Sequence, residues 1–244
     1  MLSIIILTKN SQDTIKRTLK SIEGFGDEVL VIDSDSNDDT KKIVKGFDIR
    51  MVEKKFIDFS DQRNYGIDRT SGEWVLYVDS DEELTEDFKN EVKEIISKTD
   101  VMSGYYLQRK TYYFGKDWGL IDKVQRLFLR KKFIGWYGLV HETPKIEGEF
   151  GVISSPINHF THSNLFQMVN KTNDWSNFEA ELRLKSKHPR MTILRFCRII
   201  LTGFISSYLN DKGYKNGTKG MIESIYQSFS MFITYAKLWE KQNN

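Results

Sequence analysis

The sequence of 244 residues has little of what several protein classes require. Its one cysteine, Cys197, excludes a disulfide framework and a cysteine-based zinc site. With 3 prolines and 16 glycines, neither a collagen-like segment nor a long disordered one is expected. No Walker loop and no G-x-G-x-x-G motif occurs, which excludes the usual ATPase and dehydrogenase sites.

Long apolar runs are also absent. Residues 1–7 are apolar, but they are too few for the core of a signal peptide and have no basic lead-in. The longest later stretch, residues 193–209, contains Arg195 and Arg198 and is too short to span a bilayer. We therefore expect a cytoplasmic protein without a membrane-spanning helix.

The two signs of charge nearly balance, so the net charge of +2 neither indicates nor excludes a nucleic-acid partner. Their distribution is uneven, because residues 161–244 carry 12 basic against 6 acidic residues and residues 1–160 carry 24 against 28. This contrast of +6 with −4 suggests separate roles for the two parts, although a solvated helical surface gives the same count. We predict two domains, residues 1–160 and residues 161–244.

The first of these parts alternates apolar runs with helical patterns. The runs typical of strands are residues 3–7, 29–32, 50–53, 74–78, 105–108 and 125–129. The helical patterns are residues 11–22, 40–46, 60–70 and 86–98. This alternation predicts an α/β fold with a doubly wound mixed sheet. After a loop that contains His159 and His162, the rest of the chain has helical spacing and forms a helical C-terminal extension.

Polar clusters follow three of the predicted strands. They are Thr8-Lys9-Asn10, Asp33-Ser34-Asp35-Ser36 and Asp79-Ser80-Asp81-Glu82. Doubly wound sheets bind ligands at the carboxyl ends of their strands, so three such clusters together predict a binding site there.

The sharpest single signal is Asp79-Ser80-Asp81. Carboxylates two positions apart on extended backbone point the same way, so a turn could aim both at one hard cation. Magnesium or manganese would bind them and also bridge diphosphate oxygens. The alternative is a helix start, in which Asp81 and the two following glutamates favour the dipole of the next helix.

The order and spacing of several motifs resemble a known family. The segments LTKN (7–10), VIDSDSNDDT (31–40), QRNYGI (62–67) and YVDSDEEL (77–84) look like the nucleotide-binding half of inverting family 2 glycosyltransferases with the GT-A fold. The later segments RLFLR (126–130), GLVHE (138–142) and INHFTHS (157–163) are similar to the branch that contains lipopolysaccharide-core glucosyltransferases. The resemblance covers nearly the whole chain.

This resemblance implies a set of donor-binding residues. In this sequence they are Thr8, Asn10, Asp33, Ser34, Arg63, Asp79 and Arg126. A serine, Ser34, stands where many relatives carry a second aspartate, which leaves the base open. The resemblance also implies a divalent cation, Mg²⁺ or Mn²⁺, held by Asp81 and Asp79. His159 would complete the metal shell or contact phosphate; the alternative for His159 is a structural role.

For the base that deprotonates the acceptor hydroxyl, the resemblance implies Glu142, with His141 as the alternative. Glu142 would otherwise pair with Arg126 or Arg130. Nearby aromatic residues, Trp118, Trp136 and Tyr137, suit either an acceptor site or ordinary core.

The predicted function is metal-dependent inverting transfer from a nucleoside-diphosphate sugar, UDP-linked by preference, to a saccharide or lipid-linked acceptor in cell-envelope polysaccharide synthesis. The alternatives are a sugar nucleotidyltransferase and a non-catalytic carbohydrate-binding protein of the same fold. No nucleic-acid partner is implied. For the basic helical region we expect packing within the chain or in a homodimer, with peripheral membrane contact at the inner face as a second hypothesis.

Overall fold

The computed structural model describes residues 1–138, 142–162 and 164–244, and these form two compact units. The first unit comprises Met1–Tyr112 and Gly119–Thr161, and the second comprises Tyr113–Trp118 and His162–Asn244. The tip of one β-arm therefore belongs to the C-terminal unit, while its base belongs to the first.

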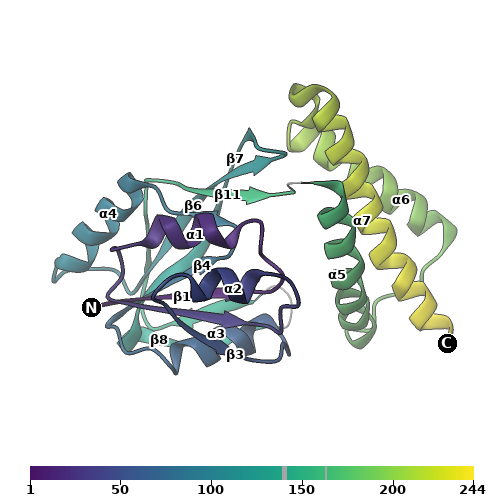
Figure 1. Cartoon of the computed structure of the whole chain (residues 1–244). Helices are drawn as coiled ribbons and strands as arrows, with labels where there is room; N and C mark the ends of the chain where they lie inside the picture. Colours follow the sequence, from purple (N-terminus) through teal and green to yellow (C-terminus); the bar gives the residue numbers. More distant parts are fainter. Residues whose placement is uncertain (139–141, 163) are drawn as a thin grey trace. The chain divides into compact units, whose positions relative to one another are not determined.

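Strands and helices alternate in the first unit (Figure 1). In chain order they are β1 (Leu2–Thr8), α1 (Ile15–Ile22), β2 (Glu28–Asp33), α2 (Thr40–Lys45), β3 (Arg50–Glu53), α3 (Phe59–Ile67), β4 (Trp74–Asp79), β5 (Glu82–Glu83), α4 (Glu86–Ser97), β6 (Gly104–Tyr113), β7 (Lys116–Leu129), a 3₁₀ turn (Arg130–Lys132), β8 (Phe133–Tyr137), β9 (Thr143–Ile146), β10 (Phe150–Val152) and β11 (Ile157–Thr161).

Within the described residues, the main sheet has nine strands in the order β3-β2-β1-β4-β7-β6-β11-β5, with β10 beside β6. β1 pairs in parallel with both β2 and β4, β2 with β3, and β4 pairs antiparallel with β7. β8 and β9 form a separate antiparallel pair. The predicted α/β fold with a mixed sheet is confirmed.

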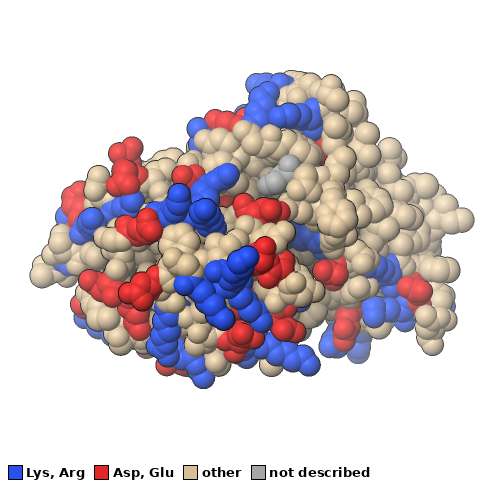
Figure 2. Space-filling model, viewed as in Figure 1, with Lys and Arg blue, Asp and Glu red and all other residues tan. Residues whose placement is uncertain are grey.

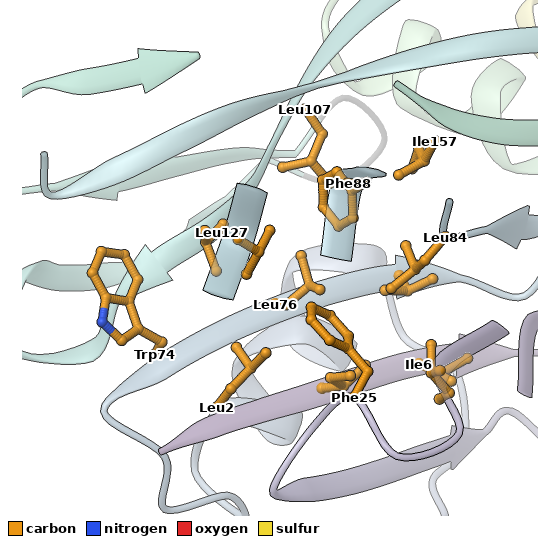
Figure 3. Close-up of a cluster of buried hydrophobic side chains, with 14 of the residues drawn as sticks. Leu2, Ile6, Phe25, Trp74, Leu76, Leu84, Phe88, Leu107, Leu127 and Ile157 are labelled. Carbon is orange, nitrogen blue, oxygen red and sulfur yellow. The ribbon is translucent and has the colours of Figure 1, made fainter. Parts of the chain in front are cut away.

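The sheet is buried on both faces, which explains its continuous apolar strands. Alternate residues of β1 point to opposite sides, so Leu2, Ile4 and Ile6 join one apolar cluster while Ile5 joins another. Helices α1, α2 and α4 cover the first cluster, which Figure 3 shows around Leu76 and Phe88. Helix α3 and strand β8 cover the second.

Two local predictions differ from the structure. The strand predicted at residues 125–129 begins at Lys116, because β6 and β7 form a long arm whose turn has positive φ at Phe114 (51°) and Gly115 (69°). His159, predicted in a loop, lies in β11, where it pairs with Glu82 of β5. Its short strand lacks the alternating pattern that would have predicted it.

The second unit consists mainly of three helices: α5 (Leu165–Lys185), α6 (Ile193–Ile205) and α7 (Gly217–Asn243). A π turn (Ser206–Asn210) and a 3₁₀ turn (Gly213–Asn216) join α6 to α7. Ala180, Met191, Ile199 and Leu238 form a small apolar core between the helices. No helix among the described residues is both long enough and apolar enough to cross a bilayer.

Candidate active site

The carboxyl ends of β1, β2 and β4 lie together at one edge of the sheet. The strand register sets Leu7 of β1 opposite Asp79 of β4, and Thr8 opposite Asp33 of β2. The parallel pairing therefore collects the three predicted polar clusters at one edge, as doubly wound sheets do.

Asp79 lies at the centre of a cluster of guanidinium groups. Arg126 donates from Nη2 to Asp79 Oδ2 at 3.0 Å, and Arg63 donates from Nη2 to Asp79 Oδ1 at 3.1 Å. Arg109 Nη1 lies 3.9 Å from Asp79 Oδ2. Burial opposes ionisation of Asp79, but the charges of Arg126, Arg63 and Arg109 outweigh it and hold the pKa of this carboxyl well below its usual range.

Arg63 reaches this cluster because α3 packs directly on the sheet. A Cβ on Gly66 would lie 2.7 Å from Ile32 Cδ1 and 2.8 Å from Ile5 Cγ2, so a larger residue here would have to displace these side chains or the helix. One turn earlier, Arg63 is 2% exposed, and its backbone carbonyl accepts a hydrogen bond from Tyr77 Oη at 2.9 Å. Helix α3 is thereby fixed over the end of β4.

Arg63 also connects Asp79 with Glu142, which lies far away in the sequence. Its Nε donates to Glu142 Oε1 at 2.9 Å, while Nη2 contacts Asp79. Glu142 thus pairs with Arg63, and not with Arg126 or Arg130, the partners that the alternative to a base role gave it. The indole of Trp136 lies beneath this arginine, with the guanidinium carbon 5.0 Å from the ring centroid.

Two further members of the cluster are Glu82, which the sequence places only in a polar cluster without a role of its own, and Arg109, which the sequence does not indicate. Glu82 is fully buried and accepts a hydrogen bond from the backbone N–H of Asp79 at 2.8 Å. Burial, together with the Asp79 charge, raises the pKa of Glu82. Arg109 lies 3.3 Å from Glu82. Only long-range pairing brings Arg109 to β5, so no local pattern predicts it.

Asp81 and His159 form a separate pair beside Asp79. His159 Nε2 lies 3.5 Å from Asp81 Oδ2, because β11 pairs with β5 and the backbone N–H of Phe160 donates to the Asp81 carbonyl. Burial lowers the pKa of His159, but the hydrogen bond to Asp81 and the negative charge of Asp81 together outweigh it, so the net shift is upward.

Among residues 1–138, 142–162 and 164–244, no set of three or more His, Cys, Asp or Glu side chains is arranged to hold a metal ion. One carboxylate and one imidazole nevertheless suit a divalent cation that takes its other ligands from diphosphate and water. Asp81 and His159 fit that role. Both oxygens of Asp79 instead accept hydrogen bonds from arginines.

The remaining predicted donor-binding residues lie at the ends of β1 and β2. Thr8, Asp33 and Ser34 are buried there. Asp33 accepts hydrogen bonds from the backbone N–H and the hydroxyl of Ser36 at 2.8 and 2.6 Å, so it holds its own turn. Asn10 is exposed with φ of 48°, and its backbone N–H donates to Ser36 Oγ.

Several buried donors of the site have no hydrogen-bond partner among the described residues. They include Thr8 Oγ1, Arg63 Nη1 and Arg126 Nε. An unmet buried donor is costly, and a bound ligand can supply the missing acceptor. These atoms indicate where a ligand with acceptor oxygens would bind.

The alternative base and the three aromatic residues predicted near the acceptor differ in their locations. His141, the alternative base, lies outside the described residues. Trp136 and Trp118 are buried, in the first and second units respectively, whereas Tyr137 is 53% exposed. Of the three aromatic residues, Tyr137 alone is therefore open to an acceptor.

Comparison with known proteins gives consistent results. A family model, glycosyl transferase family 2, matches residues 3–145. The chain is 25% identical to an uncharacterised glycosyltransferase of Rickettsia prowazekii, over 97% of this chain and 86% of that one. It is 25% identical to the lipopolysaccharide core biosynthesis glycosyltransferase LpsC of Rhizobium meliloti, over 98% of this chain and 92% of LpsC.

Among solved structures, S. aureus TarS 1–349 in complex with UDP-GlcNAc has a similar fold, with a TM-score of 0.50 and 12% identity over 99% of this chain and 91% of that one. The fold is therefore GT-A-like, as the resemblance implied. The family model covers more than half of the sequence. The chain belongs to glycosyl transferase family 2, and it is a glycosyltransferase.

Proposed function

We propose that this glycosyltransferase is metal-dependent and inverts configuration as it moves a sugar from a UDP-linked donor to a saccharide or lipid-linked acceptor. The observation that carries the proposal is the bridge made by Arg63 between Glu142 and Asp79. It brings a carboxylate suited to a base beside the strand ends where family members bind their donors.

The first step of the mechanism is removal of a proton from the acceptor hydroxyl. Inverting transfer needs one base for this, in contrast to the pair of carboxylates that glycosidases use. Arg63 holds Glu142 by Oε1, and we assign Oε2 to the hydroxyl. As that oxygen attacks the anomeric carbon, the bond to the nucleoside diphosphate breaks on the opposite face.

The leaving diphosphate carries negative charge, and the site has several positive groups for it. Arg63 and Arg126 each keep a buried N–H without a partner among the described residues. A divalent cation at Asp81 and His159 would offset further charge when it is bound. Asp79, held by arginines, would contact the sugar or ribose and orient those arginines.

The acceptor class is proposed from LpsC, whose name places it in lipopolysaccharide core biosynthesis. The similarity extends over nearly the full length of both chains, so a related envelope saccharide is the acceptor that we propose. The exposed ring of Tyr137 would stack on the C–H face of such a sugar.

A product assay with labelled nucleotide sugars tests the function. Wild-type protein should release a nucleoside diphosphate, whereas release of pyrophosphate would identify a nucleotidyltransferase, and no release would indicate binding alone. Glu142→Gln keeps the size of the side chain but removes the proton acceptor. It should lower turnover by about 10²-fold or more while donor binding is retained.

The same assay tests the cation. Asp81→Asn and EDTA treatment should each abolish transfer that added Mn²⁺ or Mg²⁺ supports in the wild type. Unchanged turnover in Glu142→Gln together with loss in His141→Ala would move the base to His141. Full activity of Asp81→Asn in EDTA would refute metal dependence.

A further inference from the structure

Helix α6 carries apolar side chains on both of its faces. Its inner face, with Phe196 and Ile199, packs against the small core of the second unit. Its outer face carries Leu194, Leu201 and Ile205, which are 82%, 60% and 48% exposed. Their spacing of seven and four residues places all three on one side of a helix. A helix that is apolar all round is normally buried, so a partner is needed for this outer face.

Helix α7 carries a second exposed apolar stripe. Ile225, Phe229 and Phe232 recur at helical spacing and are 55%, 38% and 38% exposed. The ring centroid of Phe232 lies 5.8 Å from that of Phe196 on the inner face of α6, so this stripe begins where α7 packs against α6. Trp239 continues the α7 stripe and is 49% exposed. In Figure 2, the part of the visible face over α5–α7 is mostly tan, and its charged side chains gather toward its lower end.

The charges of the segment that carries the α6 stripe are almost all positive. The segment of residues 190–222 contains Arg190, Arg195, Arg198, Lys212, Lys215 and Lys219 but one acidic residue, Asp211. Arg198 projects from α6 between Leu194 and Leu201 and is exposed. Exposed apolar side chains bordered by cations are complementary to a membrane surface, where acyl chains lie beneath negatively charged headgroups.

We propose that the outer faces of α6 and α7 bind an anionic lipid surface and hold the protein peripherally on a membrane. Leu194, Leu201 and Ile205 enter the boundary between headgroups and acyl chains. Arg195, Arg198 and the lysines that follow contact the phosphates. The tyrosine and tryptophan at the margins, Tyr214 and Trp239, suit the same interfacial layer.

A second copy of the chain fits this surface less well. A two-fold contact would place the same patch of both copies face to face, so the basic segment would lie against itself. Like charges brought together at an interface are unfavourable, whereas anionic headgroups neutralise them.

Vesicle flotation of the full-length protein tests the proposal, with vesicles of equimolar phosphatidylcholine and phosphatidylglycerol compared with phosphatidylcholine alone. The protein should float with the anionic vesicles, and added salt should weaken binding. The double variant Leu194→Gln/Leu201→Gln should partition at least about tenfold more weakly. Arg195→Gln and Arg198→Gln should each cost about fivefold.

The matched control is Ile121→Gln on β7. The isoleucine is 57% exposed, and this exposed fraction is similar to the 60% of Leu201. It should float like the wild type, and circular dichroism should show that every variant keeps its melting temperature. Failure to float with anionic vesicles would overturn the proposal, as would equal flotation of the double leucine variant. A dimer by analytical ultracentrifugation that the same leucine substitutions disperse, without vesicle binding, would assign the surface to a second copy.

Discussion

Each of the two units buries a cluster of charged and polar side chains, but the two clusters differ in how completely their hydrogen bonds are made. In the first unit, Arg63 and Arg126 bind Asp79 and still keep buried N–H groups without a partner among the described residues. In the second unit, the cluster around His162 and Glu223 has none of its buried side-chain atoms left unpaired among those residues.

The second cluster joins the arm tip to the helices. His162 Nδ1 lies 2.8 and 3.0 Å from the two oxygens of Glu223, which also accepts from Gln227 Nε2 at 2.7 Å. The ring of Tyr113 stacks on His162 with centroids 4.9 Å apart, and the N–H of Phe114 donates to the His162 carbonyl. Every contact is internal to the unit, which is the pattern of a structural network.

A binding site and a structural network can be told apart by how completely their buried groups are paired. Evolution of a purely structural network favours complete pairing, because each unmet buried group costs free energy of folding. A binding site must keep groups available for its ligand, so it is incomplete in the free protein. By this criterion the strand ends of the first unit form a ligand-binding site, and the His162–Glu223 cluster has a structural role.

Of the substitutions that test this difference, removal of Arg63 should change stability and turnover the most. Arg63→Ala leaves Asp79 and Glu142 partly buried without their shared cation, and breaking such a pair costs about 3–5 kcal/mol. Urea denaturation followed by tryptophan fluorescence should show that decrease in the free energy of unfolding. Turnover should also be lost, because Glu142 loses the guanidinium that orients it, while Asp79 keeps Arg126.

Arg69→Ala, an exposed arginine that follows the same helix, is the control. Its guanidinium lies over the ring of Tyr65 and its loss should cost less than about 1 kcal/mol. Equal losses of stability in the two variants would show that the charge cluster does not hold α3.

The sequence predicted the parts of this arrangement that depend on local pattern. The buried strands follow from their apolar runs, and the three polar clusters follow from the rule that parallel strands end at one edge. Which side chains meet was harder to predict. Glu142 pairs with Arg63 through contacts between distant segments, and Arg109 reaches Glu82 from another strand. Such contacts depend on register and helix packing, which periodicity does not encode.

The second unit shows the same limit. The sequence predicts a helical C-terminal region, and helices are present there. The buried face of α6 is centred on Ile199 and Gly203, whereas Cys197 and Leu201 of the same helix are exposed. Apolar residues on one side of a helix indicate its buried face. When apolar residues occur all round a helix, the pattern does not indicate which face is buried.

Removal of Glu223 should have a smaller effect, confined to stability. Glu223→Ala takes away hydrogen bonds to a charged group from His162 and Gln227, which are together worth about 2–3 kcal/mol. Thermal unfolding should show the loss, while KM for the donor stays unchanged because the residue serves the scaffold. Glu240→Ala, an exposed acid on the same helix, should behave like the wild type. A rise in KM in Glu223→Ala alone would break the proposed separation of roles.

The smallest change in the free energy of unfolding is expected at Thr8, and here a substitution should not lower stability. Its hydroxyl is buried without a partner among the described residues, so Thr8→Val removes an unmet polar group at nearly constant shape. The free energy of unfolding without ligand should stay equal or rise by up to about 1 kcal/mol. Thr18→Val is the control, because the Thr18 hydroxyl donates to the Ser80 carbonyl at 3.0 Å and its loss should lower stability by about 1 kcal/mol.

With nucleotide present, the same substitution of Thr8 should be unfavourable, because it should weaken nucleotide binding. If this hydroxyl contacts the donor, Thr8→Val should weaken binding of UDP about fivefold to tenfold in isothermal titration calorimetry, the value of one hydrogen bond. Stability gained without ligand and affinity lost with it would together mark Thr8 as a group kept for the substrate. Lower stability without ligand and unchanged affinity would place Thr8 with the closed network of the second unit, and the distinction between the two clusters would then fail at this residue.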